Sequence, residues 1–409
     1  MIERPAKILA SILTTSLLVG CLDESDDSVE VVIGSVPCGP EHAQNFSKGI
    51  LNADYITAAQ MDTGAASHVL FVESGDITQN DLIPFADKDD FVLAGRSSYF
   101  YQLGRKTIDT FQKYFYSSPE AGLYQTENEL GFTLRNAGND TSPNGHSVGF
   151  VNDSTAVISR YDADKAWVVN LDAQLESEFK TCELDLSEYN IYETSPETGE
   201  QVSVSVSNMD QVQIHENYAV IVLQRLDQNW VAQDAYAAIF DLNTWEEIDT
   251  NPNEDGLKGI KLELKNHQGS AIIDDSLYLT SLIYGVPNTG GIEKVDLSTL
   301  TTSIVNTQYG YSKIAITENK NVYATSYTGW EDNGLHQITG ATNSIIDTVS
   351  GEFLYSLSAR KNELWLGIGL KGDGSNQPKL SRYNAEDNSK IGSDILVNGT
   401  PKDIVFIEK

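Results

Sequence analysis

The sequence predicts an all-β protein, a seven-bladed β-propeller closed by pairing of its N-terminal strands with its C-terminal strand. Three observations lead to this fold class. After residue 54, no long segment shows the period of an amphipathic helix. A unit of four short strands recurs along the chain instead. A single apolar strand, "PKDIVFIEK", ends the chain without a partner beside it in the sequence.

The recurring unit begins with two strands joined by a polar turn rich in Asn and Asp, as a tight reversal requires. A third strand, often ending near Asp-Leu, and a short outer strand follow. Four-stranded antiparallel sheets repeated in this way make a propeller. Insertions lengthen the earlier units, whereas the later ones recur at a spacing usual for blades. Six complete units are predicted, beginning at Leu82, His146, Asp210, Gln268, Tyr311 and Phe353.

The final strand matches the first position of a seventh unit. Its second and third strands are available at the start of the fold, in "YITAAQ" from Tyr55 and "SHVLFVES" from Ser67. Such a composite blade closes the ring and removes two exposed sheet edges. Six or eight blades stay possible, because an insertion can hide or imitate a blade. A linear β-solenoid fits less well, because the strands are long and no short fixed repeat is present.

The first residues have the features of an exported lipoprotein. Arg4 and Lys7 precede the apolar run "ILASILTTSLLVG", which is short for a membrane span and suits a signal peptide. The run ends at "LLVGC", which resembles the bacterial lipobox with Cys21 as the lipidated residue. The residue after the lipidated cysteine helps to sort bacterial lipoproteins. Here it is Leu22 in place of Asp, which in proteobacteria favours the outer membrane. The alternative is an ordinary secretory signal in which Cys21 is incidental.

These features divide the chain into a signal peptide (1–20), a lipidated cysteine with an acidic tether (21–54) and a propeller domain (55–409). The protein is therefore expected in the cell envelope, as a periplasmic or surface-exposed outer-membrane lipoprotein held through its lipid anchor. Cys38 and Cys182 remain after lipidation, and an oxidising compartment favours a disulfide between them. Two free buried thiols are the alternative.

Composition and motifs exclude several functions. The net charge of −32, from 59 acidic and 27 basic residues, makes nucleic acid an unexpected partner. Neither a nucleophile elbow, a zinc-protease motif, a haem motif nor a phosphate-binding loop is present in the sequence. The protein is therefore not expected to be an enzyme, and no cofactor is expected.

In a propeller, the ends of the second strands and the starts of the first strands meet on one face, where ligands often bind. Several cationic and aromatic residues follow the predicted second strands. Arg provides a planar fork for anions, and Tyr and Trp provide stacking area. Alternatively, these residues balance nearby acids and anchor loops. The predicted ligand-binding residues are Arg96, Arg160, Tyr161, Arg225, Trp230, Tyr284, Tyr327, Trp330 and Lys371.

His146 and His267 each open a predicted first strand and complete this list, because both are expected near the channel mouth. Two histidines beside acidic loops could hold a metal, but no ligand spacing supports a metal site, and hydrogen-bonded polar histidines are the alternative. His215 is expected to be structural. Three insertions precede first strands and are expected to project over the same face, at residues 115–145, 187–208 and 250–266.

The lipobox, the acidic tether, "YITAAQ…SHVLFVESGD" and the irregular blades resemble seven-bladed propellers with YVTN-type repeats. They are similar above all to surface propeller lipoproteins that partner TonB-dependent outer-membrane transporters, including a cobalamin-binding member from gut Bacteroidetes. The resemblance implies a binding protein that captures a small molecule, such as a metal chelate, siderophore or cofactor, for a transporter. A scaffold for protein assembly is the alternative, and a lactonase-like hydrolase is the third hypothesis.

Overall fold

The computed structural model describes residues 36–48, 55–63, 67–73, 75–85, 89–116, 124–126, 131–136, 138, 141–252, 256–329, 332–350, 353–370 and 374–408. The expected signal peptide, Cys21 and residues 22–35 and 49–54 of the expected tether lie outside this set. Helical structure in the described part is limited to η1 (Pro40–His42), α1 (Glu176–Phe179) and η3 (Ser187–Tyr189). No helix in the described ranges is long and apolar enough to cross a membrane.

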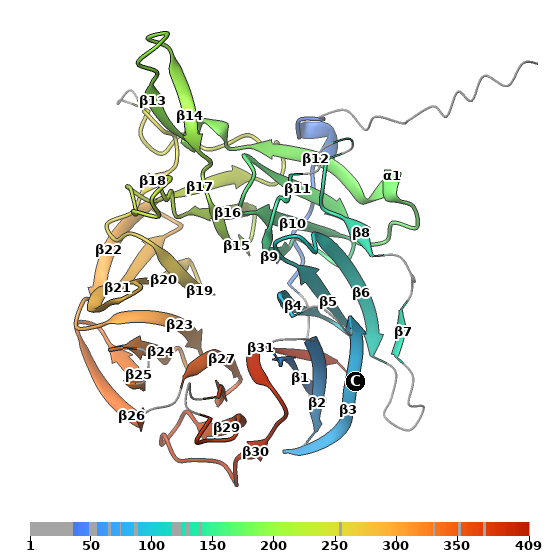
Figure 1. Cartoon of the computed structure of the whole chain (residues 1–409), viewed down its shortest axis with the longest axis vertical. Helices are drawn as coiled ribbons and strands as arrows, with labels where there is room; N and C mark the ends of the chain where they lie inside the picture. The colour runs from blue at the N-terminus through green and yellow to red at the C-terminus, as the bar shows by residue number, and fades with distance from the viewer. Residues whose placement is uncertain are drawn as a thin grey trace, which may run out of the picture. The chain divides into compact units, whose positions relative to one another are not determined.

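Seven antiparallel sheets follow one another around a common centre, so the predicted seven-bladed propeller is confirmed (Figure 1). We number the blades by the chain order of their inner strands, and name the strands of each blade from the centre outward. Blade 1 consists of β4 (Phe91–Arg96), β5 (Tyr99–Gly104), β6 (Thr110–Tyr116) and β7 (Tyr124–Thr126), with β8 (Phe132–Thr133) also paired to β6. Blade 2 consists of β9 (Gly145–Phe150), β10 (Thr155–Arg160), β11 (Lys165–Asn170) and β12 (Lys180–Asp185).

Blades 3 to 6 repeat this order along the chain. Blade 3 consists of β15 (Met209–His215), β16 (Tyr218–Leu223), β17 (Tyr236–Asp241) and β18 (Ile260–Lys261). Blade 4 consists of β19 (His267–Ile273), β20 (Ser276–Ile283), β21 (Val286–Asp296) and β22 (Thr301–Asn306). Blade 5 consists of β23 (Gly310–Ile316), β24 (Val322–Tyr327), β25 (Asp332–Thr339) and β26 (Thr342–Ser350). Blade 6 consists of β27 (Leu354–Arg360), β28 (Glu363–Ile368), β29 (Lys379–Asn384) and β30 (Ile395–Leu396).

Blade 7 is the predicted composite blade. Its strands are β31 (Thr400–Glu408), β1 (Tyr55–Asp62), β2 (Ser67–Glu73) and β3 (Asp76–Phe85). The C-terminal strand β31 is innermost and pairs antiparallel with β1 from Tyr55↔Glu408 to Asp62↔Thr400. The strand that ends the sequence thus finds its partner among the first strands of the ring, and their pairing closes the propeller.

The first predicted unit is displaced by one strand. The segment from Leu82, expected as the inner strand of blade 1, ends β3, which is the outer strand of blade 7. Phe91–Arg96, expected as a second strand, is the inner strand β4. The composite blade needs a fourth strand, and β3 supplies it, so the next blade begins one strand later. This displacement moves Arg96 to the opposite end of its blade from the predicted one.

The hydrophobic core lies between the blades. Seven clusters of buried side chains in the described residues each join two neighbouring blades. Second strands are buried on both sides, as in β10, where every residue from Thr155 to Arg160 is buried. In β10, Ala156 and Ile158 pack toward blade 1, whereas Val157 packs toward blade 3. Each blade is therefore stabilised by the two beside it.

Residues 36–48 form a strap that is part of the propeller unit. Its first residues run parallel to the outer strand β12, with the Cys38 N–H donating to the Glu183 carbonyl at 3.0 Å. The predicted disulfide between Cys38 and Cys182 is present, and Cys182 is fully buried in the cluster between blades 2 and 3. The Trp245 indole N–H donates to the carbonyl of His42 at 2.7 Å. Contacts with the propeller therefore begin before residue 55.

Replacing both cysteines of the strap, Cys38→Ala with Cys182→Ala, is expected to lower the free energy of unfolding by about 2–4 kcal/mol. The disulfide encloses a long loop, with a sequence separation of 144 residues. Its loss raises the conformational entropy of the unfolded chain and so favours unfolding. Urea unfolding followed by circular dichroism measures the loss. A reducing agent should destabilise the wild type equally and the variant not at all. Identical unfolding of the variant and the oxidised wild type would contradict the bond.

Candidate functional site

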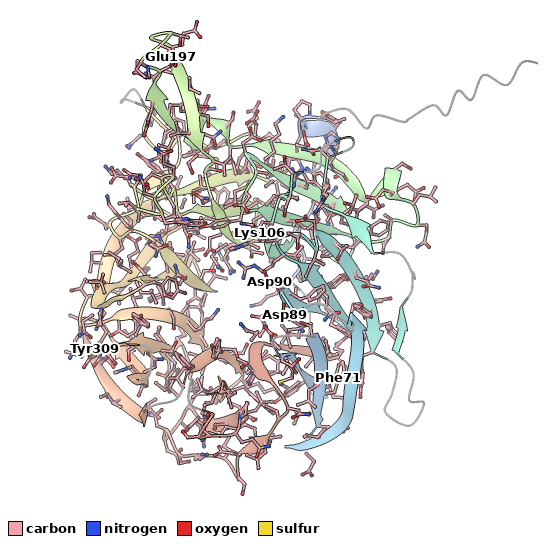
Figure 2. All side chains as sticks on the ribbon, in the orientation of Figure 1. Phe71, Asp89, Asp90, Lys106, Glu197 and Tyr309 are labelled. Carbon is pink, nitrogen blue, oxygen red and sulfur yellow. A yellow bond between two sulfur atoms is a disulfide. The ribbon has the colours of Figure 1, made fainter. Side chains whose placement is uncertain are left out.

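A cavity of about 940 Å³ lies at one end of the ring axis, and residues of all seven blades line it. We call it the cup. Its lining comes from the starts of inner strands, the ends of second strands and the loops beside them. Figure 2 shows Asp89, Asp90 and Lys106 near the centre of the ring, whereas Glu197 lies far out at the tip of a hairpin. The cup thus occupies the face that the sequence predicts.

An asparagine in the left-handed conformation leads into three of the inner strands. Asn144, Asn208 and Asn266 have φ values of 56°, 52° and 54° and directly precede β9, β15 and β19. Asn tolerates this conformation better than most residues. Each of the three carbonyls accepts a backbone N–H from the end of the neighbouring second strand. These asparagines therefore set the register at the mouth of the cup, a recurrent signal that the sequence prediction missed.

The register explains why the two predicted histidines have different environments. Side chains alternate along a strand, so successive residues face opposite sides. His146 is the second residue after Asn144 and lines the cup, as Asp210 and Gln268 do after their asparagines. His267 is the first residue after Asn266, so it turns into the blade and is fully buried. Its Nε2 bonds Glu293, which is also fully buried, so His267 is not part of the cup.

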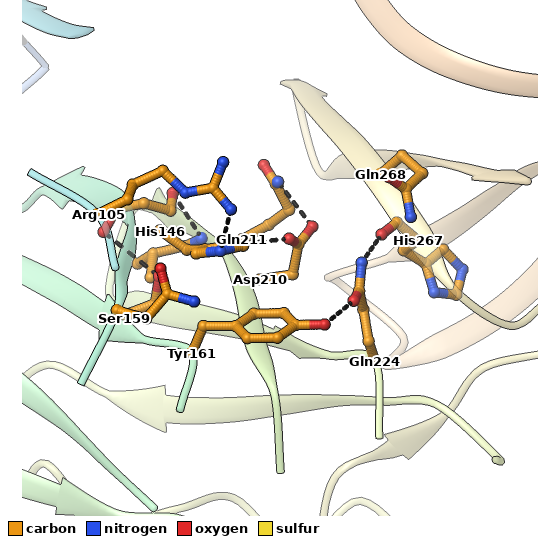
Figure 3. Close-up of polar contacts among 12 residues, drawn as sticks. Arg105, His146, Ser159, Tyr161, Asp210, Gln211, Gln224, His267 and Gln268 are labelled. Atoms are coloured by element: carbon orange, nitrogen blue, oxygen red, sulfur yellow. Dashed lines mark hydrogen bonds and ion pairs between the residues drawn. The ribbon is translucent and has the colours of Figure 1, made fainter. Parts of the chain in front are cut away.

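Blades 1 to 3 supply a polar wall built around His146 (Figure 3). The His146 Nδ1 lies 3.1 Å from the Asp210 Oδ1, and its Nε2 contacts the Arg105 Nη2. A guanidinium only donates hydrogen bonds, so Nε2 accepts and the proton of the neutral ring lies on Nδ1, toward Asp210. The Tyr161 ring stacks on the imidazole, with centroids 4.2 Å apart. Arg105 and Asp210 were not predicted.

Asp210 is held as a carboxylate in this wall. Burial by itself would raise its pKa, but hydrogen bonds from His146 and Gln211 and the positive charge of Arg105 outweigh burial and lower the pKa. The network continues from Tyr161, whose hydroxyl donates to the Gln224 Oε1 at 2.6 Å. The Gln224 amide donates to the carbonyl of His267. The side chains of the polar wall therefore hold one another in place.

Blades 3 to 6 supply an aromatic wall opposite. Trp230 and Tyr284 are exposed at the rim, at 69% and 57% of their maximal areas. The Tyr284 and Tyr327 rings meet edge to face with centroids 6.0 Å apart, and the Tyr327 hydroxyl accepts the Gly285 N–H at 3.2 Å. Tyr355, from blade 6, also lines the cup. The two walls present hydrogen-bonding groups and stacking surfaces, respectively, to one space.

Five of the predicted binding residues line the cup: His146, Tyr161, Trp230, Tyr284 and Tyr327. Trp330 and Lys371 lie outside the described residues. The three predicted arginines do not line the cup, because each is held elsewhere.

Arg96 lies at the far end of blade 1, on the face away from the cup. It ends β4, so it sits opposite the end where Arg105 enters the cup. Its Nε donates to Asp153 at 2.7 Å, and its Nη2 donates to the carbonyl of Ser47 in the strap at 2.8 Å. The placement of Arg96 at the cup was therefore wrong, as a direct result of the displaced first unit.

Arg160 and Arg225 lie at the correct end of their blades but point away from the cup. The Arg160 guanidinium lies 4.2 Å from the centroid of Trp167, and burial lowers its pKa to about 10. Arg225 donates to the carbonyls of Tyr189 and Asp234, at 2.8 and 3.0 Å. Arg225 anchors loops, which is the alternative that the sequence left open, whereas Arg160 packs on strand β11 of its own blade.

The predicted insertions contribute little to the cup. Among their described residues, Asn144 and Asn266 line it. The insertion 187–208 forms a separate hairpin of β13 (Ile191–Thr194) and β14 (Gln201–Ser205), which projects away from the ring (Figure 1). The insertion 250–266 provides β18 as the outer strand of blade 3. The expected projection over the ligand face is therefore not seen for these two segments.

One group of possible metal ligands is found among the described residues, on the face away from the cup. His215, Glu216 and Asp275 place their ligand atoms within 4.8 Å of one another. The His215 Nε2 lies 3.0 Å from Asp275, so this histidine links the hairpin turns of blades 3 and 4. The predicted structural role of His215 is consistent with this contact.

No protein family matches the sequence, and no curated protein matches it. Among solved structures, apo AztD from Citrobacter koseri is similar at 14% identity and a TM-score of 0.47, covering 86% of this chain and 98% of that one. The PQQ-bound aldose sugar dehydrogenase from Streptomyces coelicolor is similar at 11% identity and a TM-score of 0.40, covering 62% and 81%. Similarities at this level carry no argument about function.

Asp210→Asn is expected to lower the free energy of unfolding by about 1–3 kcal/mol at pH 7, because it removes the charged acceptor of His146. The pKa of Asp210 is lowered in the folded state. Its stabilisation is therefore complete above the ordinary Asp pKa of about 3.9 and is lost as the pH falls further. Urea unfolding at several pH values should show wild type and variant converging below about pH 4.

The control is Asp274→Asn, which removes an exposed carboxylate paired with Lys320. It should change stability by less than about 1 kcal/mol. A constant difference between the Asp210 variant and the wild type across the pH range would contradict the assigned charge.

Proposed function

We propose that this propeller is a binding protein that holds a small molecule in the cup. The observation that carries the proposal is the cup itself, about 940 Å³ in volume, with a polar wall facing an aromatic wall. Ligand sites commonly combine stacking surface with a few fixed polar groups. The volume lies toward the upper end of the range for such sites, which suits a bulky ligand such as a metal chelate, siderophore or cofactor.

The polar wall favours binding over catalysis. A general base needs a ring nitrogen free to take a proton from the reacting group. Both ring nitrogens of His146 are already bonded, to Asp210 and to Arg105. These interlocked side chains fix donors and acceptors in advance, which reduces the entropy lost when a ligand binds.

The aromatic rim supports the same proposal. Trp230 and Tyr284 expose large side chains beside a cavity, where a ligand could cover them. Tyr and Trp give contact area at a low cost in conformational entropy. In the full proposal, the protein is anchored in the outer membrane through Cys21, captures the molecule and passes it to a TonB-dependent receptor.

Tyr284→Ala with Tyr327→Ala is expected to abolish ligand capture, because the variant loses the stacking surface of blades 4 and 5. Thermal unfolding with a panel of cobalamin and ferric siderophores measures capture as a rise in melting temperature. Arg96→Ala with Arg225→Ala is the control, because neither arginine lines the cup. It should bind as the wild type does, although it melts at a lower temperature. Loss of capture in the arginine control alone would contradict the placement of the site.

A scaffold function has one observation in its favour, the hairpin of β13 and β14. It exposes Tyr192 and Val202 at 45% and 48% of their maximal areas, on a two-stranded sheet that pairs with no blade in the described structure. A pull-down that captures an outer-membrane barrel protein, and that fails when the hairpin is deleted, would favour the scaffold. The melting temperature should then not shift with any ligand of the panel.

Cys21→Ser is expected to release the protein from the membrane fraction, because the proposed anchor is a lipid on that sulfur. Cell fractionation and labelling with a fatty-acid analogue measure the change. Cys38→Ser with Cys182→Ser is the matched control and should stay in the membrane. Retention of the Cys21 variant in the membrane would argue for an uncleaved or different anchor.

A further inference from the structure

Four cations of the described residues line the cup, and two of them already have partners. The Arg105 Nη1 lies 3.5 Å from Asp90, and its Nη2 contacts His146. The Lys402 Nζ lies 3.5 Å from Asp62 and 5.0 Å from the centroid of Tyr355. The third, Lys106, is exposed at the rim. The fourth, Lys313, is the one that points to a ligand.

Lys313 lies in the middle of β23, the inner strand of blade 5, and is partly buried in the wall of the cup. Its backbone N–H donates to the Thr325 Oγ1 at 3.1 Å, which holds the strand in register. Across the described ranges, no hydrogen bond or ion pair is formed by its ammonium group. An anionic group that enters the cup can therefore pair with this ammonium without displacing another partner.

One compensating charge comes from Asp403 of β31, in blade 7. The charges of Lys313 and Asp403 interact, but the two side chains make no direct ion pair. The Asp403 Oδ2 already accepts the Leu93 N–H at 3.1 Å. Burial of its carboxyl raises the pKa of Asp403. The charged form of this carboxyl is therefore less favoured than that of an exposed Asp. Both side chains line the cup.

The large negative charge of the whole chain does not exclude an anion here. The Debye length is about 8 Å at physiological salt, so distant surface acids are screened. Several acids of the lining are already engaged: Asp62 with Lys402, Asp90 with Arg105 and Asp210 with His146. Local groups therefore decide which charge the cup accepts.

We propose that the cup binds a ligand carrying an anionic oxygen group, a carboxylate, sulfonate or phosphate, which pairs with Lys313 while the aromatic wall holds an apolar body. The inference rests on the proposed binding function and names the chemical class of its ligand. Tyr327 lies in blade 5, the blade of Lys313, and Tyr284 and Tyr355 lie in the neighbouring blades 4 and 6. One molecule can therefore reach both features.

Two fluorescent probes separate the charge from the apolar body. Anilinonaphthalene sulfonate and N-phenylnaphthylamine share an aromatic skeleton, and only the first carries an anionic group. Titration of the folded protein should show that one sulfonate probe binds per chain, more tightly than the neutral probe. Lys313→Met should weaken binding of the sulfonate about tenfold to a hundredfold, the usual effect of losing a charged hydrogen bond. Binding of the neutral probe should change less than about twofold.

Three further variants sharpen the test. Lys313→Arg should keep most of the preference for the sulfonate. Asp403→Asn should tighten binding of the sulfonate without affecting the neutral probe, because it removes the acid that faces Lys313. Lys320→Met, an exposed lysine paired with Asp274, is the matched control and should change neither affinity. Melting temperatures confirm that each variant is folded.

The outcomes separate this inference from the proposed function. Equal binding of the two probes in the wild type, or an equal loss of both in Lys313→Met, overturns the anionic class and leaves the binding function standing. If neither probe binds in a way that Tyr284→Ala weakens, both the anionic class and the proposed binding function are overturned. A charge-selective loss in Lys313→Met, with the Lys320 control unchanged, supports both.

Discussion

The antiparallel pairing of β1 with β31 is the contact on which the rest of the propeller depends. It runs over eight residue pairs and joins the first strand of the ring to the last. Closing so long a loop costs entropy that grows only slowly with its length, and it removes two sheet edges. Side chains of β31 enter the clusters on both sides, with Ile404 facing blade 6 and Ile407 facing blade 1. The same strand brings Lys402 and Asp403 to the cup, so closure and binding site form together.

The blade architecture could be predicted because its strongest signals are local. Second strands are buried on both sides and show as continuous apolar segments, which a sequence displays plainly. The lone apolar strand at the C-terminus required a partner, and the strands from Tyr55 and Ser67 were the available ones. The first unit was harder, because β3 is a strand of blade 7 that is followed at once by the inner strand of blade 1. A sequence shows consecutive strands but not the sheet to which each belongs.

The cup was predicted to the correct face but only in part to the correct residues. Its side chains lie on inner strands, where polar and apolar residues mix and a shift of one residue reverses the side that a residue faces. His146 and His267 were both expected to open a strand, but His146 is the second residue after its asparagine and His267 is the first, so they face opposite sides. Arg105 could have been found once β4 was recognised as the inner strand of blade 1, because Arg105 directly follows the second strand β5. The true position of Arg96 could not be predicted, because it depended on the first unit, which was displaced by one strand.

The cup also shows how a strongly acidic protein can favour one kind of charge in one place. Several acids of the lining are held by a neighbour: Asp62 pairs with Lys402, Asp90 pairs with Arg105, and Asp210 is stabilised by a hydrogen bond with His146 and by the charge of Arg105. What faces the cavity is therefore the charge that pairing leaves over, not the net charge of the chain. Lys313 and Asp403 belong to that remainder, on the inner strands of blades 5 and 7, and they make no direct ion pair with each other. Because β31 is placed by ring closure, the distance between them is set by the fold and not by their own contact. A ligand that enters between them meets a lysine without a direct partner and a carboxyl whose raised pKa eases its neutralisation, and both effects favour an anion over a cation.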